Sequence, residues 1–153
     1  MLRNFDNRLN ADVIHCLRAM GHGDDLVICD TNFPADSVAR HTVTGNLLRM
    51  DNISAAEAIE AILSVFPLDS FVDAPAERME VGSNPKEVPP VQAEVQKVID
   101  KAEGKSWPMG SVERFAFYEK AKNAYAVIVT GETRFYGCFV LKKGVIPPKG
   151  LTR

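Results

Sequence analysis

Residues 20–30, MGHGDDLVICD, place a histidine on one side of a short apolar run and an aspartate on the other. His22 stands between two glycines, which can adopt positive φ values and leave the imidazole uncrowded. Because a free imidazole titrates close to neutral pH, this histidine is suited to moving protons. The alternative is a loop histidine on the surface, or one bonded to Asp24 or Asp25. We expect these two aspartates to be solvated or to cap the loop.

Asp30 follows the apolar run at 26–29, which has the continuous β-branched pattern of a strand buried on both faces. Ligands of open α/β sheets gather at the carboxyl ends of the strands. A carboxylate at this point could therefore hold a sugar hydroxyl or a proton. The alternative is a helix N-cap or an Asx-turn that opens the segment TNFPADS.

Two later segments, RFAFYE at 114–119 and RFYGC at 134–138, add groups that could hold a polyhydroxyl ligand. The Arg114 guanidinium offers five donors in a fixed plane. Tyr136 can donate or accept a proton, and Gly137 would let a ligand approach the backbone. The alternative for Tyr136 is a ring packed at the start of a strand. Most of the neighbouring aromatic rings are expected in the core: Phe115, Phe117 and Tyr118.

The composition limits the class of protein and its partners. A chain of 153 residues, 46% hydrophobic and 25% charged, has the proportions of one globular domain. The net charge of −2 argues against nucleic acid or an anionic membrane as the main partner and favours a neutral small molecule. No apolar run has the length of a signal peptide or a membrane span, so we expect a cytoplasmic protein.

Several site signatures are absent from the sequence. Cys16, Cys29 and Cys138 are odd in number and widely spaced, which predicts reduced, mostly buried thiols without a disulfide or zinc site. No dinucleotide loop, P-loop, zinc-protease or serine-hydrolase motif occurs. Hydride transfer, phosphoryl transfer and zinc hydrolysis therefore lose support. His15 and His41 are interpreted as structural residues.

The elements that must position these groups alternate between helices and strands. A helix is predicted from the N-cap Asn10 to Met20, ended by a left-handed Gly21; a second follows the capping box of Ser54 and Glu57; a third covers 91–102 and ends at Gly104. Strands are predicted at 26–29, 125–130 and 138–144, with a possible strand at 78–82. Residues 30–39 and 83–90 are expected to be loops, and 114–124 a helix or a strand that turns into one.

This alternation predicts a single layered α/β domain over residues 1–153, with a mostly parallel sheet flanked by helices. No repeat, low-complexity tract or linker divides the chain.

The segments MGHGDDLVICDTNFPADS, ERFAFYEKAKNAYAVIVTGETRFYG and VLKKGV resemble the RbsD/FucU family of sugar mutarotases, which includes L-fucose mutarotases and D-ribose pyranases. The resemblance extends from the first predicted helix to about Val145. It implies an RbsD-like fold and an isomerase that interconverts sugar anomers without a cofactor or metal. It also implies a homodecameric ring with each sugar site near a subunit boundary, so that one chain could complete the pocket of its neighbour.

The resemblance also assigns roles to individual residues. It implies that His22 is the general acid/base and that Asp30 and Arg114 bind the sugar. Our own hypothesis is that Tyr136 or a bound water is the partner of His22 in proton transfer. Arg114 favours the fucose branch, because the ribose branch usually has histidine at this point. The segment from Tyr136 through Gly137 to Cys138 corresponds to a sugar-binding tripeptide.

Cys138 departs from the family pattern, which commonly has asparagine there, so the preferred hydroxyl pattern stays open. The alternatives to an L-fucose mutarotase are a D-ribose pyranase and a non-catalytic protein that binds sugar or assists its transport.

Overall fold

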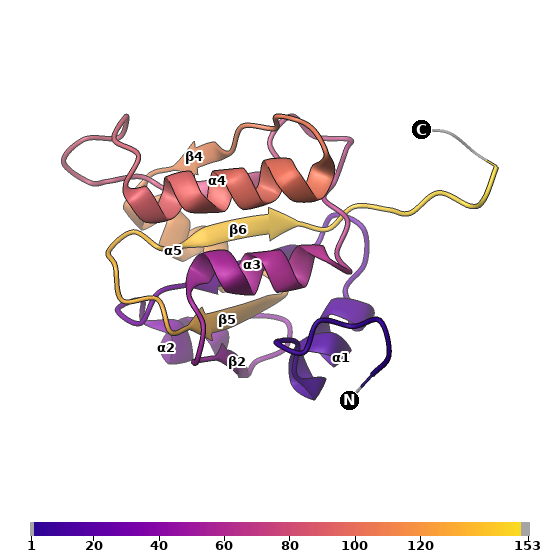
Figure 1. The fold of residues 1–153 in the computed structure, drawn as a ribbon. Coiled ribbons are helices and arrows are strands. Elements are labelled where there is room, and N and C mark those ends of the chain that lie inside the picture. Colours follow the sequence, from indigo (N-terminus) through magenta and orange to yellow (C-terminus); the bar gives the residue numbers. More distant parts are fainter. Residues whose placement is uncertain (1, 151–153) are drawn as a thin grey trace.

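The strand at residues 26–29 lies at the centre of the sheet, in a computed structural model that describes residues 2–150. β1 (Asp25–Cys29) pairs in parallel with β5 (Ala126–Thr130) and antiparallel with β6 (Phe139–Lys142). Residues 26–29 are buried, and so is all of β5. These three apolar strands confirm the sequence prediction, and their burial follows from the helices that cover both faces of the sheet (Figure 1).

The described residues form one mixed sheet of six strands in the order β2-β5-β1-β6-β3-β4. The outer strands are β2 (Leu47–Met50), β3 (Ala76–Met79) and β4 (Gly110–Val112). β2 and β5 are parallel, as are β3 and β4, whereas β6 is antiparallel to both of its neighbours. Five strands therefore run in one direction, which agrees with a mostly parallel sheet, and β6 is the exception.

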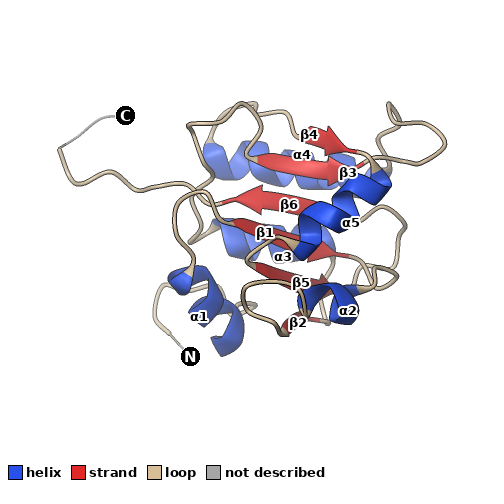
Figure 2. Ribbon diagram, turned by 180° about the vertical axis from the view of Figure 1, so that it is seen from behind, coloured by secondary structure: helices blue, strands red, loops and turns tan. Residues whose placement is uncertain are grey.

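Two helical layers enclose this sheet. On one face lie α3 (Ala55–Leu63) and α4 (Pro90–Glu103); on the other lie α2 (Ala35–Ala39) and α5 (Arg114–Lys122), as Figures 1 and 2 show from opposite sides. Each face has its own apolar core. α1 (Ala11–Ala19) lies beside β2 and packs into the core on the α3 and α4 side.

The predicted caps explain where three helices begin or end. The Asn10 side chain accepts a hydrogen bond from Val13 N–H at the start of α1. At the start of α3, Ser54 and Glu57 form the reciprocal capping box. Gly104 ends α4 with φ of +67°, the left-handed conformation that favours glycine.

Other predictions were wrong in position. Gly21 does not end α1 in a left-handed conformation: the helix stops at Ala19, Met20 has φ of −59°, and Gly23 is the left-handed residue of the following turn, with φ of +85°. The expected loop at 30–39 contains the short helix α2. The possible strand at 78–82 begins earlier, as β3. β2 and β4 were not predicted, because both are short and incompletely buried.

The direction of β6 determines what can meet at one edge of the sheet. β1, β3 and β5 all end at this edge, while the antiparallel β6 begins there. The segment 131–138 between β5 and β6 therefore lies beside the residues that follow β1. The loop around His22, which precedes β1, belongs to the opposite edge.

Candidate sugar site

A cavity of about 370 Å³ opens at the carboxyl edge of the sheet. Its volume lies within the range usual for small-molecule sites. Four of the predicted site residues line it: Asp30, Arg114, Tyr136 and Cys138. The other lining residues are Asn32, Phe33, Met79, Tyr118 and Phe135.

A larger hollow of about 520 Å³ lies elsewhere, beside His15 and Tyr125. We favour the smaller cavity because it combines a buried carboxylate with a guanidinium and two phenols, which are the groups that bind hydroxyls.

Asp30 is 4% exposed and forms part of both the fold and the cavity wall. Its Oδ1 accepts hydrogen bonds from Asn32 N–H at 2.9 Å and Phe33 N–H at 3.1 Å. Asp30 therefore forms the Asx-turn that the sequence offered as an alternative, and it also lines the cavity. Its Oδ2 accepts from Gly137 N–H at 3.1 Å and from the Cys138 thiol at 3.5 Å. The loop after β1 and the start of β6 are thus joined through one carboxylate.

Gly137 does not line the cavity but permits this arrangement. A Cβ atom at Gly137 would lie 2.8 Å from Cγ of Glu132 and 3.3 Å from Cβ of Asp30. These distances are closer than Cβ contacts normally allow. Glycine is therefore needed here for the approach of two side chains within the protein, a reason that differs from the backbone approach to ligand expected from the sequence.

Arg114 is the first residue of α5 and lies at the exposed side of the cavity. The Glu113 carboxylate caps this helix by accepting hydrogen bonds from Phe115 N–H at 2.9 Å and Ala116 N–H at 3.0 Å. The Arg114 Nε donates to the Tyr118 hydroxyl at 3.4 Å, and this contact raises the pKa of the guanidinium. Arg114 thus places a positive charge at the cavity, with several donors unused by Tyr118.

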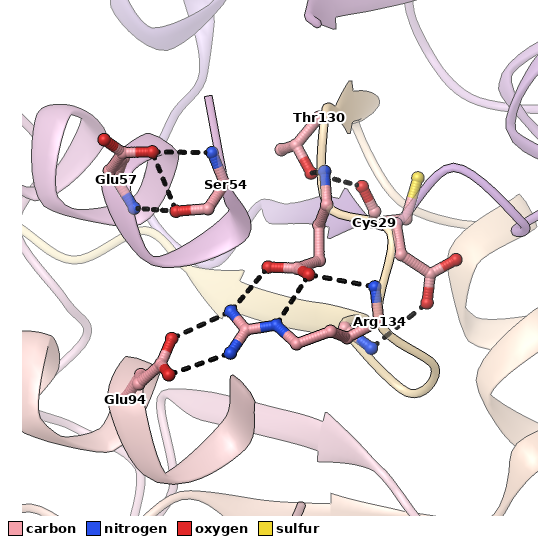
Figure 3. Close-up of polar contacts among 9 residues, drawn as sticks. Cys29, Ser54, Glu57, Glu94, Thr130 and Arg134 are labelled. Carbon is pink, nitrogen blue, oxygen red and sulfur yellow. Dashed lines mark hydrogen bonds and ion pairs between the residues drawn. The ribbon is translucent and has the colours of Figure 1, made fainter. Parts of the chain in front are cut away.

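The segment 131–138 is held by charged residues (Figure 3). Arg134 donates to both carboxylate oxygens of Glu132, at 2.8 and 2.9 Å, and to both of Glu94 on α4, at 2.8 Å each. The Arg134 hydrogen bond lowers the pKa of Glu132, against the effect of burial, which raises it. The Thr130 hydroxyl donates to the Cys29 carbonyl at 2.9 Å and so joins the ends of β5 and β1.

All three cysteines are free and buried, as predicted. Burial raises the pKa of the Cys138 thiol well above its ordinary value, and the neighbouring Asp30 carboxylate raises it further. Cys138 is therefore a neutral thiol, which is a weak donor, where a carboxamide would offer both a donor and an acceptor.

His22 is not among the residues that line this cavity. The five residues of β1 separate it from Asp30, and at roughly 3.3 Å per residue that strand alone spans about 13 Å. The His22 side chain is 46% exposed and its Nε2 lies 3.1 Å from Oδ1 of Asp69. Its ring centroid is 5.4 Å from that of Phe71, a side chain that is itself exposed.

The Asp69 carboxylate determines which nitrogen of the neutral His22 imidazole carries the proton. Burial raises the pKa of Asp69, but hydrogen bonds from Phe71 N–H and His22 outweigh it, so that the pKa is lowered overall. An ionised carboxylate can only accept, so in the neutral imidazole Nε2 carries the proton and Nδ1 is free to accept another.

The His22 loop is also anchored to the end of β6. Lys142 Nζ lies 2.6 Å from an Asp25 carboxylate oxygen, and Gly23 N–H donates to the Lys143 carbonyl at 2.8 Å. Lys143 Nζ donates to the Met20 carbonyl at 2.6 Å, beyond the last turn of α1. The segment VLKKGV therefore holds the His22 loop in place.

Sequence reasoning missed half of the cavity wall. Phe33 and Tyr118 line the cavity although neither was predicted to do so. Three rings of α5 were expected in the core, but only Phe117 is fully buried, and Phe115 is 68% exposed. Phe33 could have been found from its place in the loop after a buried strand. Asp24 caps the loop as expected, accepting from Gly21 N–H at 2.7 Å. Neither His15 nor His41 lines the cavity.

Within residues 2–150, no helix is long and apolar enough to cross a membrane. The same part of the chain holds no group of three or more histidine, cysteine, aspartate or glutamate side chains arranged to bind a metal ion.

Known proteins are similar to this chain in sequence and in fold. Residues 3–146 match the family model described as the RbsD / FucU transport protein family. The fucose mutarotase of Bos taurus is 38% identical over 154 residues, which cover 99% of this chain and 98% of that protein. A crystal structure of a protein to which sugar binding has been ascribed is 67% identical, with a TM-score of 0.94, and the match covers 96% of this chain and 97% of that one. The fucose mutarotase of Streptococcus pneumoniae, solved in complex with L-fucose, is 34% identical with a TM-score of 0.85, over 95% of this chain and 100% of that one.

Proposed function

Since the chain belongs to the RbsD/FucU family, we propose that it is a sugar mutarotase that interconverts the α and β anomers of L-fucose. The observation that carries this proposal is the meeting of Asp30, Arg114 and Tyr136, from three distant segments, around one cavity of suitable size. Relatives named fucose mutarotases, similar over nearly the whole chain, support the reaction and the sugar.

The cavity offers different contacts to the two kinds of surface that a sugar presents. Asp30 and Arg114 bind hydroxyls, while the rings of Phe33 and Phe135 can pack on C–H groups. Four donors already surround the Asp30 carboxylate, and the Cys138 thiol at 3.5 Å is the weakest of them. A sugar hydroxyl can therefore take the place of that thiol at Oδ2.

The reaction opens and recloses the hemiacetal. A base removes the proton of the anomeric hydroxyl, the bond between C1 and the ring oxygen breaks, and an acid protonates the ring oxygen. The aldehyde then rotates about the bond between C1 and C2 and closes on its other face, with both proton transfers reversed. In our proposal His22 exchanges the proton of the anomeric hydroxyl through Nδ1, and Tyr136 or a water serves the ring oxygen.

The reaction is redox-neutral and returns every proton, so it requires no cofactor. One positioned acid or base commonly contributes about 10²- to 10⁴-fold, which suffices for a reaction that already proceeds slowly in water. We further propose that the enzyme acts in the cytoplasm.

Because His22 and Asp30 lie at opposite edges of the sheet, we propose that each site is shared by two copies of the chain. His22 of one copy would reach the cavity of the next, as in the ring-shaped decamer that the family resemblance implies. Exposed aromatic side chains at both edges support such a contact: Phe71 beside His22 is 71% exposed, and Phe135 at the cavity is 73% exposed. Exposed apolar surface of this kind often marks an interface.

Saturation-transfer NMR measures the proposed activity on a panel of L-fucose, D-ribose, galactose and rhamnose. We expect the protein to accelerate anomer exchange most for L-fucose, and His22→Ala to lower that acceleration by about 10²- to 10⁴-fold. Preference for D-ribose would instead identify a pyranase. Binding of L-fucose without faster exchange would identify a sugar-binding protein, and exchange that is unaffected by His22→Ala would contradict the role of His22.

A further inference from the structure

Tyr136 has a backbone conformation that tyrosine rarely adopts, with φ of +62°. Residues other than glycine are strained in this left-handed region, so neighbouring contacts must hold them there. The Tyr136 hydroxyl accepts a long hydrogen bond, 3.4 Å, from Gly82 N–H. Its carbonyl oxygen accepts a much shorter one, 2.9 Å, from Nε2 of Gln92 on α4.

Gln92 is fully buried, and both the oxygen and the nitrogen of its side-chain amide are hydrogen-bonded. Nε2 donates a second hydrogen bond, 2.8 Å long, to the Met79 carbonyl, and Oε1 accepts one of 3.0 Å from Arg78 Nη1. Carbonyls can only accept and a guanidinium can only donate, so these partners fix which end of the amide is which. Neither Tyr136 nor Met79 can turn its carbonyl away without leaving a buried donor of Gln92 unpaired.

The two carbonyls that Gln92 joins belong to two neighbouring segments of the chain that both line the cavity. Met79 ends β3, Tyr136 lies in the segment before β6, and the side chains of both line the cavity. Arg78 also donates to the Glu87 carbonyl at 3.1 Å, so the loop that follows β3 is tied to the same amide. One side chain of α4 therefore fastens Tyr136 to the end of β3, beside the backbone hydrogen bond of 3.0 Å from Met79 N–H to the Cys138 carbonyl.

We propose that Gln92 is a positioning residue for sugar turnover: it holds Tyr136 in its left-handed conformation and at a fixed distance from Met79. Gln92 does not line the cavity and acts on the ligand through Tyr136. The catalytic consequence rests on the proposed mutarotase function, whereas the structural consequence does not.

Two variants of Gln92 test this role, with a control from the same helix. Gln92→Leu removes both donors, and Gln92→Glu keeps the length and the acceptor for Arg78 but removes the donors. Gln96, one turn later, makes similar hydrogen bonds to Asp100 Oδ1 and the Trp107 carbonyl, each 2.9 Å, away from the cavity. We expect kcat/KM for L-fucose to fall about 10- to 100-fold in both Gln92 variants, as small misplacements of site groups commonly cause, and to stay unchanged in Gln96→Leu.

A double variant separates positioning from loss of stability. If Gln92 acts through Tyr136, Gln92→Leu should cost much less in a Tyr136→Phe background than in the parent protein, because residues that act as a unit are not additive. Crystal structures of the Gln92 variants should show Tyr136 no longer at positive φ, or displaced from Met79.

Equal losses in the two backgrounds, or a Gln92 variant crystal structure with Tyr136 unmoved, would overturn the proposal. If the parent protein itself fails to accelerate anomer exchange, the proposed function is wrong, and the crystal structures alone decide the role of Gln92.

Discussion

Single residues in this protein often serve the fold and the site together. Asp30 caps the loop after β1 with one carboxylate oxygen and fastens the segment before β6 with the other, while lining the cavity. Gly137 contributes no side chain, and its value lies in the space it leaves for Asp30 and Glu132. A substitution at either position should therefore change stability and sugar binding at once.

Gly137→Ala tests this coupling at the residue scale. The added Cβ would lie 2.8 Å from Cγ of Glu132, and that side chain cannot easily move because Arg134 holds it. We expect a loss of about 1–3 kcal/mol in stability, typical of overpacking, together with a raised KM for L-fucose. Thermal unfolding and anomer-exchange kinetics measure the two effects.

Gly104→Ala is the control for this experiment. Gly104 also has a conformation that disfavours a side chain, with φ of +67°, but no atom lies within 4 Å of an added Cβ. It should cost about 1–2 kcal/mol without any change in KM. An unchanged KM in Gly137→Ala would show that Asp30 does not depend on this close contact.

At the scale of elements, the sequence predicted what local patterns encode. The apolar runs of β1 and β5, the capping box of α3 and the glycine end of α4 are short-range signals, and all were found in the structure. β2 and β4 were missed because each depends on pairing with a neighbouring strand and shows no long apolar run of its own. The antiparallel direction of β6 depends on pairing between distant segments, which periodicity does not record.

The residues of the candidate site also divide into those that a local sequence signal identifies and those that only the tertiary fold brings to the cavity. Asp30 was found because the end of a buried strand is a recognisable place, whereas Met79 and Phe135 reach the cavity through the tertiary fold. The separation of His22 from Asp30 follows from their positions before and after one strand. Family resemblance named both residues, and the strand predicted between them already implies that one chain keeps them apart.

The segment between β5 and β6 gives a prediction with a pH dependence. Arg134 lowers the pKa of Glu132, so ionised Glu132 contributes stability above its ordinary pKa, and this contribution is lost as the pH falls below that range. Arg134→Ala removes it and should lower the melting temperature at pH 7 by about 4–8 °C, corresponding to roughly 2 kcal/mol. The difference between variant and parent should stay constant above about pH 5 and narrow below about pH 4.

Arg40→Ala provides the matched comparison, because Arg40 forms an exposed ion pair with Asp36 on α2. Exposed pairs of this kind contribute little to stability, so its melting temperature should match that of the parent at every pH. A difference for Arg134→Ala that persists unchanged at low pH would mean that Glu132 is not the group responsible.

At the scale of the whole molecule, the sheet keeps the groups that we propose to act in one reaction at two opposite edges. The edge with the cavity holds Asp30, Arg114 and Tyr136, and the opposite edge holds His22 with its partner Asp69. Both edges expose aromatic side chains. Assembly of identical chains would bring the two edges together, so we expect activity to depend on the oligomer.

Mixed assemblies of two inactive variants test this central claim most directly. His22→Ala retains the cavity, and Asp30→Asn retains His22, so neither homomer should accelerate L-fucose anomer exchange. When the two chains are co-expressed in equal amounts and co-purified through different tags, random assembly gives about a quarter of the sites both intact groups. The account predicts that saturation-transfer NMR will recover roughly that share of the parent activity. Mixed assemblies that remain as inactive as the separate variants would show that His22 and Asp30 do not act together across two copies of the chain.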